Sequence, residues 1–190
     1  MKVKDFVTIG VFGVIYFVLM FSIGMMGLIP ILFLAWPATI GILLGPVVML
    51  FMAKVPKPTA FFIFGMLAPV LMFVMGHSFV VLVNALIFIG LAELCLYLGK
   101  YKSVRMNILA NGFFSCWACG SLVQILVVKE MYMEMTIRMM GLEYADALDR
   151  LITWPHMSII YVSAFVGGII GGFLGKAMLK KHFERAGIVS

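Results

Sequence analysis

Charged residues are scarce in this sequence, and their scarcity excludes a soluble globular protein. Only 12% of the 190 residues are Asp, Glu, Lys or Arg, whereas 64% are hydrophobic. Soluble domains have about 25% charged and about 45–50% apolar residues, so this chain is not expected to fold in water. The sequence also lacks the GxxxxGK[ST] loop that binds nucleotide phosphates, so we do not expect the chain itself to hydrolyse ATP.

Cysteine and histidine are equally rare, with three of each. The cysteines fall within apolar runs, which predicts that they form no external disulfide framework. His77, His156 and the cysteines lack the close spacing of metal ligands, so we expect neither a metal site nor another cofactor. Cys116 and Cys119 do form a CxxC motif, but a redox thiol needs access to its partners, and these two lie in the middle of an apolar run.

Long apolar runs are what the sequence has in abundance. About 20 apolar residues at a rise of 1.5 Å per residue cross the hydrocarbon core of a bilayer. The predicted fold is therefore an all-α membrane protein, a single domain over 1–190 that forms a bundle of six transmembrane helices. We place the spans at about 6–28, 31–53, 59–76, 78–99, 106–128 and 155–177, with an external loop at 129–154.

The basic residues are distributed very unequally between the two sides of such a bundle. Eleven of the fourteen fall on one side: Lys2, Lys4, Lys54, Lys57, Lys100, Lys102, Arg105, Lys176, Lys180, Lys181 and Arg185. Basic residues in short loops stay in the cytoplasm during insertion, so both termini are predicted to be cytoplasmic in a multi-pass protein of the bacterial plasma membrane. This location indicates contact with the lipid bilayer and not with nucleic acid.

The loop 129–154 carries the remaining basic residues, five acidic residues and several methionines. Its first half could extend the fifth span beyond the bilayer, and its second half has the helical periodicity of a segment lying near the membrane interface. Two interpretations stay open for this loop: simple packing at the interface, or a lid over an external pocket.

Polar residues within spans are costly and tend to face the protein interior or a cavity, which makes them candidate ligand contacts. Those in the outer half combine aromatic, amide and imidazole groups, a set that suits a small planar solute. Several of them also suit an interfacial aromatic belt or a helix cap. The candidate substrate-binding residues are Trp36, His77, Asn84, Trp117, Gln124, His156 and Tyr161. Glu93 lies toward the cytoplasmic side, where we expect it to snorkel or to pair with Lys100, Lys102 or Arg105.

Three segments resemble a known family: DFVTIGVFGVIYFVLMFSIGMMG near the start, MFVMGHSFVVL in the middle, and AFVGGIIGGFLGKAMLKKHFERAGI at the end. They are similar to the S components of energy-coupling factor (ECF) transporters and, more closely, to the Trep_Strep or MptD-like family. The resemblance implies a subunit that captures a small-molecule substrate and works with a transmembrane coupling subunit and two cytosolic ATPases.

The glycines of the first and last spans are the candidate docking surface for that coupling subunit. S components commonly carry a small-xxx-small pair on the first helix, whereas this chain has Gly10 and Gly13, three residues apart. Glycines allow close approach of helices, so Gly168 and Gly172 in the last span indicate either internal packing or docking.

The leading prediction is therefore a substrate-binding S component of an ECF-type importer, not an enzyme, that captures a vitamin, nucleobase or related heterocycle from outside the cell. Two alternatives from other classes stay open. One is a membrane thiol oxidoreductase that uses Cys116 and Cys119, and the other is a standalone small carrier or structural membrane protein.

Overall fold

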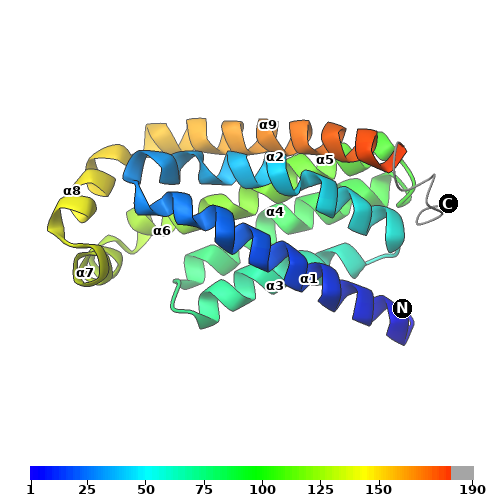
Figure 1. Cartoon of the computed structure of the whole chain (residues 1–190), viewed down its shortest axis with the longest axis horizontal. Helices are drawn as coiled ribbons and strands as arrows, with labels where there is room; N and C mark the ends of the chain where they lie inside the picture. Colours follow the sequence, from blue (N-terminus) through cyan, green and yellow to red (C-terminus); the bar gives the residue numbers. More distant parts are fainter. Residues whose placement is uncertain (181–190) are drawn as a thin grey trace.

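The computed structural model describes residues 1–180, and these residues form helices joined by short connections (Figure 1). In chain order the elements are α1 (Val3–Gly24), the 3-10 turn η1 (Met25–Leu28), α2 (Pro30–Lys54), α3 (Ala60–Val74), α4 (Phe79–Leu98), α5 (Val104–Ser115), the 3-10 turn η2 (Cys116–Cys119), α6 (Gly120–Val127), α7 (Lys129–Met140), α8 (Leu142–Leu151) and α9 (Trp154–Met178). The predicted all-α class is confirmed for this part of the chain.

Within residues 1–180, five helical segments are long and apolar enough to cross a membrane: Val3–Leu28, Pro30–Lys54, Phe79–Leu98, Val104–Val127 and Trp154–Met178. The third predicted span, 59–76, forms α3, which is apolar but has only 15 residues. At 1.5 Å per residue such a helix is about 22 Å long, shorter than a hydrocarbon core of about 30 Å. Its ends are set by the backbone, because Thr59 before it and Gly76 after it both have positive φ angles.

The most extensive contact between two helices of the described chain joins α2 and α9, which run side by side in Figure 1. Glycines make this contact possible. A Cβ atom on Gly171 would lie 2.0 Å from the carbonyl oxygen of Gly41, and one on Gly45 would lie 2.3 Å from the carbonyl carbon of Gly171. Two helix backbones therefore meet with no side chain between them, as small residues allow in membranes.

A second row of glycines on α9 faces α5. A Cβ atom on Gly168 would lie 2.4 Å from the Ser115 hydroxyl oxygen, and one on Gly172 would lie 3.1 Å from Ile108. The carbonyl of Gly168 also accepts a hydrogen bond of 2.7 Å from the Asn111 amide. Gly168 and Gly172 are thus covered by the chain itself, the internal packing that was one of the two interpretations of these glycines.

Helix α1 packs on α2 and α3 with one face and leaves its other face exposed. Gly13 belongs to the packed face, where its position meets the side chain of Leu67. Gly10 belongs to the open face, since a Cβ atom there would have no neighbour within 4 Å among residues 1–180. Of the four glycines considered for docking, Gly10 is the one that the described fold leaves accessible.

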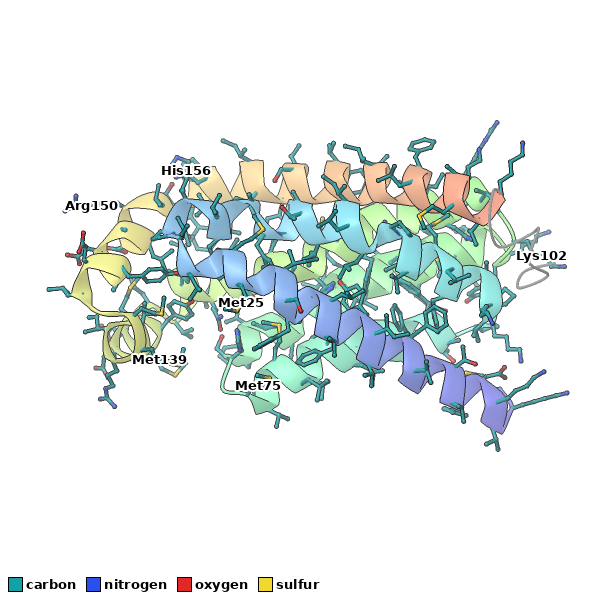
Figure 2. All side chains as sticks on the ribbon, in the orientation of Figure 1. Met25, Met75, Lys102, Met139, Arg150 and His156 are labelled. Carbon is teal, nitrogen blue, oxygen red and sulfur yellow. The ribbon has the colours of Figure 1, made fainter. Side chains whose placement is uncertain are left out.

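The two ends of the bundle carry different charges. The N-terminus and the connections after α2 and α4 lie at one end, and α7 and α8 lie at the other (Figure 1). Figure 2 accordingly shows Lys102 at the first end and Arg150 at the second. The first end holds those predicted cytoplasmic basic residues that lie within residues 1–180. The other two, Lys181 and Arg185, lie outside the described residues.

The connection 129–154 folds into two helices at the second end of the bundle. Helix α7 does not continue the fifth span, because Val128 (φ −121°, ψ 49°) breaks the helix between Val127 and Lys129. Helix α8 lies against α2 and α7, and its fully buried Leu148 belongs to a hydrophobic cluster with residues of α6 and α9. The hydroxyl of Tyr144 on α8 also donates a hydrogen bond to the carbonyl of Gly27 in η1, which ties this segment to the link between α1 and α2.

Among the described residues Glu93 pairs with no basic side chain, so the ion pair, one of the two arrangements expected from the sequence, is not formed with Lys100, Lys102 or Arg105. Its carboxylate accepts hydrogen bonds from the backbone N–H groups of Thr59 at 2.7 Å and Phe62 at 3.1 Å, and from the Tyr101 hydroxyl at 2.9 Å. The N–H groups at a helix start have no partner within the helix, and a carboxylate there is favourable. Glu93 therefore anchors the start of α3 to α4.

Candidate functional site

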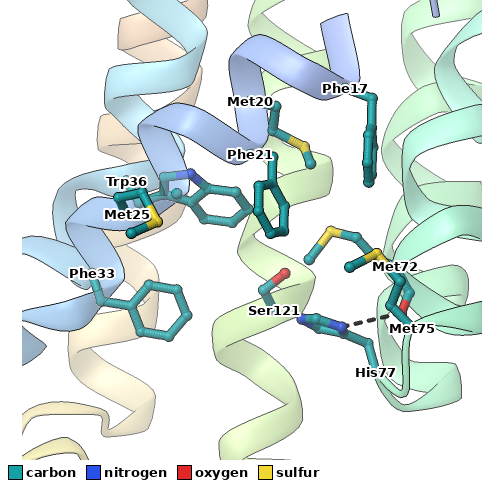
Figure 3. A pocket seen from close by; sticks show the side chains of 11 residues that line it. Phe17, Met20, Phe21, Met25, Phe33, Trp36, Met72, Met75, His77 and Ser121 are labelled. Carbon is teal, nitrogen blue, oxygen red and sulfur yellow. Dashed lines mark hydrogen bonds between the residues drawn. The ribbon is translucent and has the colours of Figure 1, made fainter. Parts of the chain in front are cut away.

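A cavity of about 190 Å³ lies toward the α7–α8 end of the bundle, enclosed by α1, α2, the end of α3 and α6 (Figure 3). Its walls are aromatic and methionine-rich, with three residues that bear polar side-chain groups. The lining residues are Phe17, Met20, Phe21, Gly24, Met25, Phe33, Trp36, Met72, Met75, His77 and Ser121. Among the described residues, no Asp, Glu, Lys or Arg lines this cavity.

Trp36 enters the cavity wall from the second turn of α2. Its side chain is 4% exposed, and within residues 1–180 its indole Nε1 has no hydrogen-bond partner. Gly24 faces this nitrogen from α1, where an added Cβ atom would lie 3.7 Å away. A buried N–H group without a partner costs free energy, so its presence in a cavity indicates a donor available to a ligand.

Ser121 lies in the first turn of α6 and is 1% exposed. A serine in a helix usually donates to the carbonyl four residues earlier, as Ser115 does to Asn111. The corresponding carbonyl for Ser121 is that of Trp117, which already accepts a 2.8 Å hydrogen bond from the amide of Asn84. The hydroxyl of Ser121 has no partner in the described part of the chain.

His77 reaches the cavity from the turn between α3 and α4. Its Nδ1 lies 3.1 Å from the carbonyl oxygen of Met72, drawn as the dashed line in Figure 3. A carbonyl can only accept, so Nδ1 carries the proton and Nε2 of the neutral ring is an acceptor. Burial lowers the pKa of His77, although the bond to Met72 opposes the shift, and the neutral ring is thereby favoured.

The cavity therefore offers a small neutral ligand three kinds of contact. Trp36 offers a donor, His77 an acceptor, and the Ser121 hydroxyl either role. A cavity of about 150 Å³ already holds a benzene-sized ring, so this one matches one ring or two small fused rings. The surrounding phenylalanines and methionines offer stacking and dispersion contacts to a flat molecule.

Of the seven predicted site residues, the structure brings only Trp36 and His77 together in this cavity. Asn84 and Tyr161 line a separate hollow on the outside of the bundle between α4, η2 and α9. There the Tyr161 hydroxyl donates to Oδ1 of Asn84, whose amide donates to the carbonyls of Cys116 and Trp117. The polar groups of this pair are thus engaged within the chain.

The other three predicted residues also have their polar groups engaged. The indole of Trp117, fully buried, donates to the Tyr16 hydroxyl at 3.1 Å. Oε1 of Gln124 accepts from both the backbone and the hydroxyl of Ser78 at the start of α4, each at 3.0 Å. His156 is exposed at the start of α9, and its Nδ1 lies 2.6 Å from the carbonyl oxygen of Leu151.

Ser121 is the contact that sequence reasoning missed. One serine in an apolar helix is unremarkable, because its hydroxyl normally bonds to its own helix. The signal that distinguishes it is the use of the Trp117 carbonyl by Asn84, from a helix remote in sequence, and no spacing along the chain reveals this.

The CxxC motif forms η2, a tight 3-10 turn between α5 and α6. Cys116, Cys119 and the remaining cysteine, Cys95, are buried and are not joined in disulfides. The thiol sulfur of Cys116 lies 3.6 Å from the Gly112 carbonyl oxygen and 3.7 Å from that of Tyr161, so its single S–H can donate to either. Within residues 1–180, no group of three or more His, Cys, Asp or Glu side chains is arranged to hold a metal ion.

The apolar helices and the neutral cavity define the broad class, an integral membrane protein whose site suits an uncharged molecule. Residues 3–185 match a family described as hypothetical bacterial integral membrane protein (Trep_Strep), and the chain belongs to this family. Comparisons with curated proteins and with solved structures found no match.

Proposed function

We propose that this protein is the substrate-binding S component of an ECF-type importer in the bacterial plasma membrane and that it binds an uncharged heterocycle, such as a nucleobase or a vitamin. Its ligand occupies the cavity between Trp36, His77 and Ser121. The observation that carries the proposal is the pair of buried polar groups without partners, the Trp36 indole N–H and the Ser121 hydroxyl, in an otherwise apolar cavity. Ligand sites combine such apolar walls with a few polar groups that fix orientation.

The position of the cavity supports import from the outside. It lies toward the end opposite the basic residues, which the distribution of Lys and Arg predicts to be external. It also lies directly below η1, to which Tyr144 of α8 is bonded. Of the two interpretations of the loop 129–154, this proposal adopts the lid. Helix α8 is that lid, and its bond to the link between α1 and α2 holds it closed over the ligand.

Ligand binding is tested first with the purified full chain. A thermal-shift screen against uncharged purines, pyrimidines and vitamins identifies a ligand, because binding to the folded state alone raises the apparent stability. Binding is then measured for Trp36→Phe and Ser121→Ala, each of which removes one hydrogen-bonding group. Each is expected to weaken binding by about tenfold, which corresponds to one lost hydrogen bond of about 1.4 kcal/mol.

Matched controls separate this loss from a general loss of structure. Trp154→Phe changes an exposed tryptophan, and Ser163→Ala changes a serine whose hydroxyl donates to the Ile160 carbonyl, away from the cavity. Both are expected to bind the ligand like the unaltered protein. Unchanged affinity in Trp36→Phe and Ser121→Ala together would show that the ligand binds elsewhere.

The transport partners need a separate test. In the proposal a coupling subunit docks on the exposed face of α1 around Gly10, and two cytosolic ATPases drive the cycle. Affinity purification from the native membrane is expected to recover a coupling subunit and ATPases with the unaltered chain. Gly10→Leu is expected to reduce that recovery without changing ligand affinity, since a Cβ atom at Gly10 would meet nothing within 4 Å in the described fold. A chain that transports its ligand when reconstituted alone would instead be a standalone carrier.

A further inference from the structure

A second cavity, of about 500 Å³, lies at the basic end of the bundle, remote from the ligand cavity. It is enclosed by the end of α2, the start of α5, the end of α9 and the turn that precedes α5. Two kinds of surface meet in it. Lys102, Lys176 and Lys180 supply charge, and Met49 and Met52 of α2 supply an apolar wall.

The three lysines come from two parts of the chain that the fold brings together. Lys102 lies in the turn between α4 and α5, whereas Lys176 lies in the last turn of α9 and Lys180 lies two residues beyond its end. All three side chains are exposed at the cavity, and no carboxylate among the described residues lines it. Their charges therefore add, and the cavity attracts an anion.

Asn107 indicates that the anion also carries a hydrogen-bond donor. It lies in the first turn of α5 and lines the cavity, yet it is only 8% exposed. Its carbonyl oxygen Oδ1 has no hydrogen-bond partner within residues 1–180. A buried acceptor without a donor is costly, so a molecule that fits here supplies an O–H or N–H group next to its negative charge.

We infer that this cavity binds the headgroup of an anionic glycerophospholipid that carries free hydroxyl groups, the chemistry of phosphatidylglycerol. The lysines hold the phosphodiester, and a headgroup hydroxyl donates to Oδ1 of Asn107. The apolar wall of Met49 and Met52 receives the glycerol backbone and the first methylene groups. The cavity lies where the spans end, which is the level of lipid headgroups and of snorkelling lysines.

Two lipids of equal charge separate the attraction of the phosphodiester by the lysines from the hydrogen bond of a headgroup hydroxyl to Asn107. Phosphatidylglycerol and phosphatidylmethanol carry the same phosphodiester charge, but only the first has hydroxyl groups. Retention of each lipid by the purified full chain is measured by native mass spectrometry, with phosphatidylcholine as the uncharged reference. The expected order is phosphatidylglycerol, then phosphatidylmethanol, then phosphatidylcholine.

Amino-acid replacements test which residues recognise the phosphodiester charge and which recognise the headgroup hydroxyl. The triple replacement Lys102→Ala, Lys176→Ala and Lys180→Ala is expected to lower retention of both anionic lipids at least tenfold. Asn107→Leu is expected to lower phosphatidylglycerol to the level of phosphatidylmethanol and to leave phosphatidylmethanol unchanged, and Asn107→Ala serves if the leucine variant does not fold. Lys2→Ala, Lys4→Ala and Lys54→Ala remove the same charge from the same end outside the cavity and are expected to have little effect.

Three results would overturn the inference. Equal retention of the two anionic lipids by the unaltered chain would remove the role of Asn107. An equal loss in both lysine triples would show a diffuse charge effect instead of a site. Displacement of phosphatidylglycerol by millimolar glycerol phosphate would show that the cavity binds a soluble phosphate ester and that the lipid tail contributes nothing.

Discussion

The indole N–H of Trp117 donates a hydrogen bond of 3.1 Å to the hydroxyl of Tyr16, and this bond joins the centre of the fifth span to α1. Both side chains are buried, and the Tyr16 ring also packs edge-on against Phe64 at a centroid distance of 5.7 Å. Helix α1 otherwise exposes much of its surface, so this bond is one of the few polar restraints on its rotation.

Tyr16→Phe is expected to lower the free energy of unfolding by about 1 kcal/mol, because it leaves the Trp117 donor buried without a partner. Titration with a denaturing detergent in mixed micelles measures the change. Tyr97→Phe, at an exposed tyrosine, is the matched control and is expected to be neutral. If the two variants unfold alike, the bond contributes nothing measurable.

Gly171→Ala is expected to destabilise the fold by about 3 kcal/mol or more, because its Cβ atom would lie 2.0 Å from the Gly41 carbonyl oxygen and backbone cannot yield as a side chain can. Gly90→Ala on α4 meets nothing within 4 Å among the described residues. In a helix without such a clash the same change is expected to be neutral or to stabilise by up to about 1 kcal/mol. The detergent titration compares the two directly, and equal effects would contradict the α2–α9 contact.

The pH dependence of stability is expected to report on His77. Burial lowers its pKa below the ordinary value of 6.5, so the unfolded chain takes up a proton at a higher pH than the folded chain does. The unfolding free energy therefore falls as the pH drops below about 6.5, and the loss levels off below the pKa of the folded state. His77→Gln is expected to remove this contribution, measured as the difference between the two unfolding profiles from pH 7.5 to pH 5. Parallel profiles would show that His77 titrates in the fold as it does in the unfolded chain.

Tyr144→Phe is expected to loosen α8 without unfolding the bundle. It removes the hydrogen bond to the Gly27 carbonyl but keeps the ring, and Leu148 stays buried in the hydrophobic cluster that it shares with residues of α6 and α9. Backbone hydrogen exchange is expected to accelerate several-fold in residues 142–151 and in η1, and to stay unchanged in α4. If the accelerated exchange is accompanied by faster release of a ligand, the lid function is supported. Unchanged hydrogen exchange in η1 would show that the Tyr144 bond does not couple α8 to the cavity.

Helix positions were largely predictable from the sequence, since a membrane span is a matter of length and hydrophobicity within one segment. The predicted ranges differ from the helices by a few residues, as at 155–177 against Trp154–Met178. The interruption of the fifth span at η2 was not predictable in the same way. Cys116–Cys119 is as apolar as its flanks, and its tight turn accompanies the two carbonyls that accept from Asn84 of another helix.

The site was predictable only in part, because depth in the membrane follows from sequence position whereas partners do not. Asn84 and Gln124 were selected as ligand contacts because a buried amide needs hydrogen bonds. That need is real, but Tyr161 and Ser78 meet it from distant parts of the chain. Trp36 was selected as an aromatic residue in the outer half of the bundle, and among the seven predicted residues its N–H is the one left without a partner in the described part of the chain.

The glycine contact between α2 and α9 joins the second span to the last one, and this has a consequence for biosynthesis. Because α2 is synthesised long before α9, Gly41 and Gly45 lack their partner helix until the chain is nearly complete. Truncation before α9 is accordingly expected to yield a chain that inserts but is rapidly degraded.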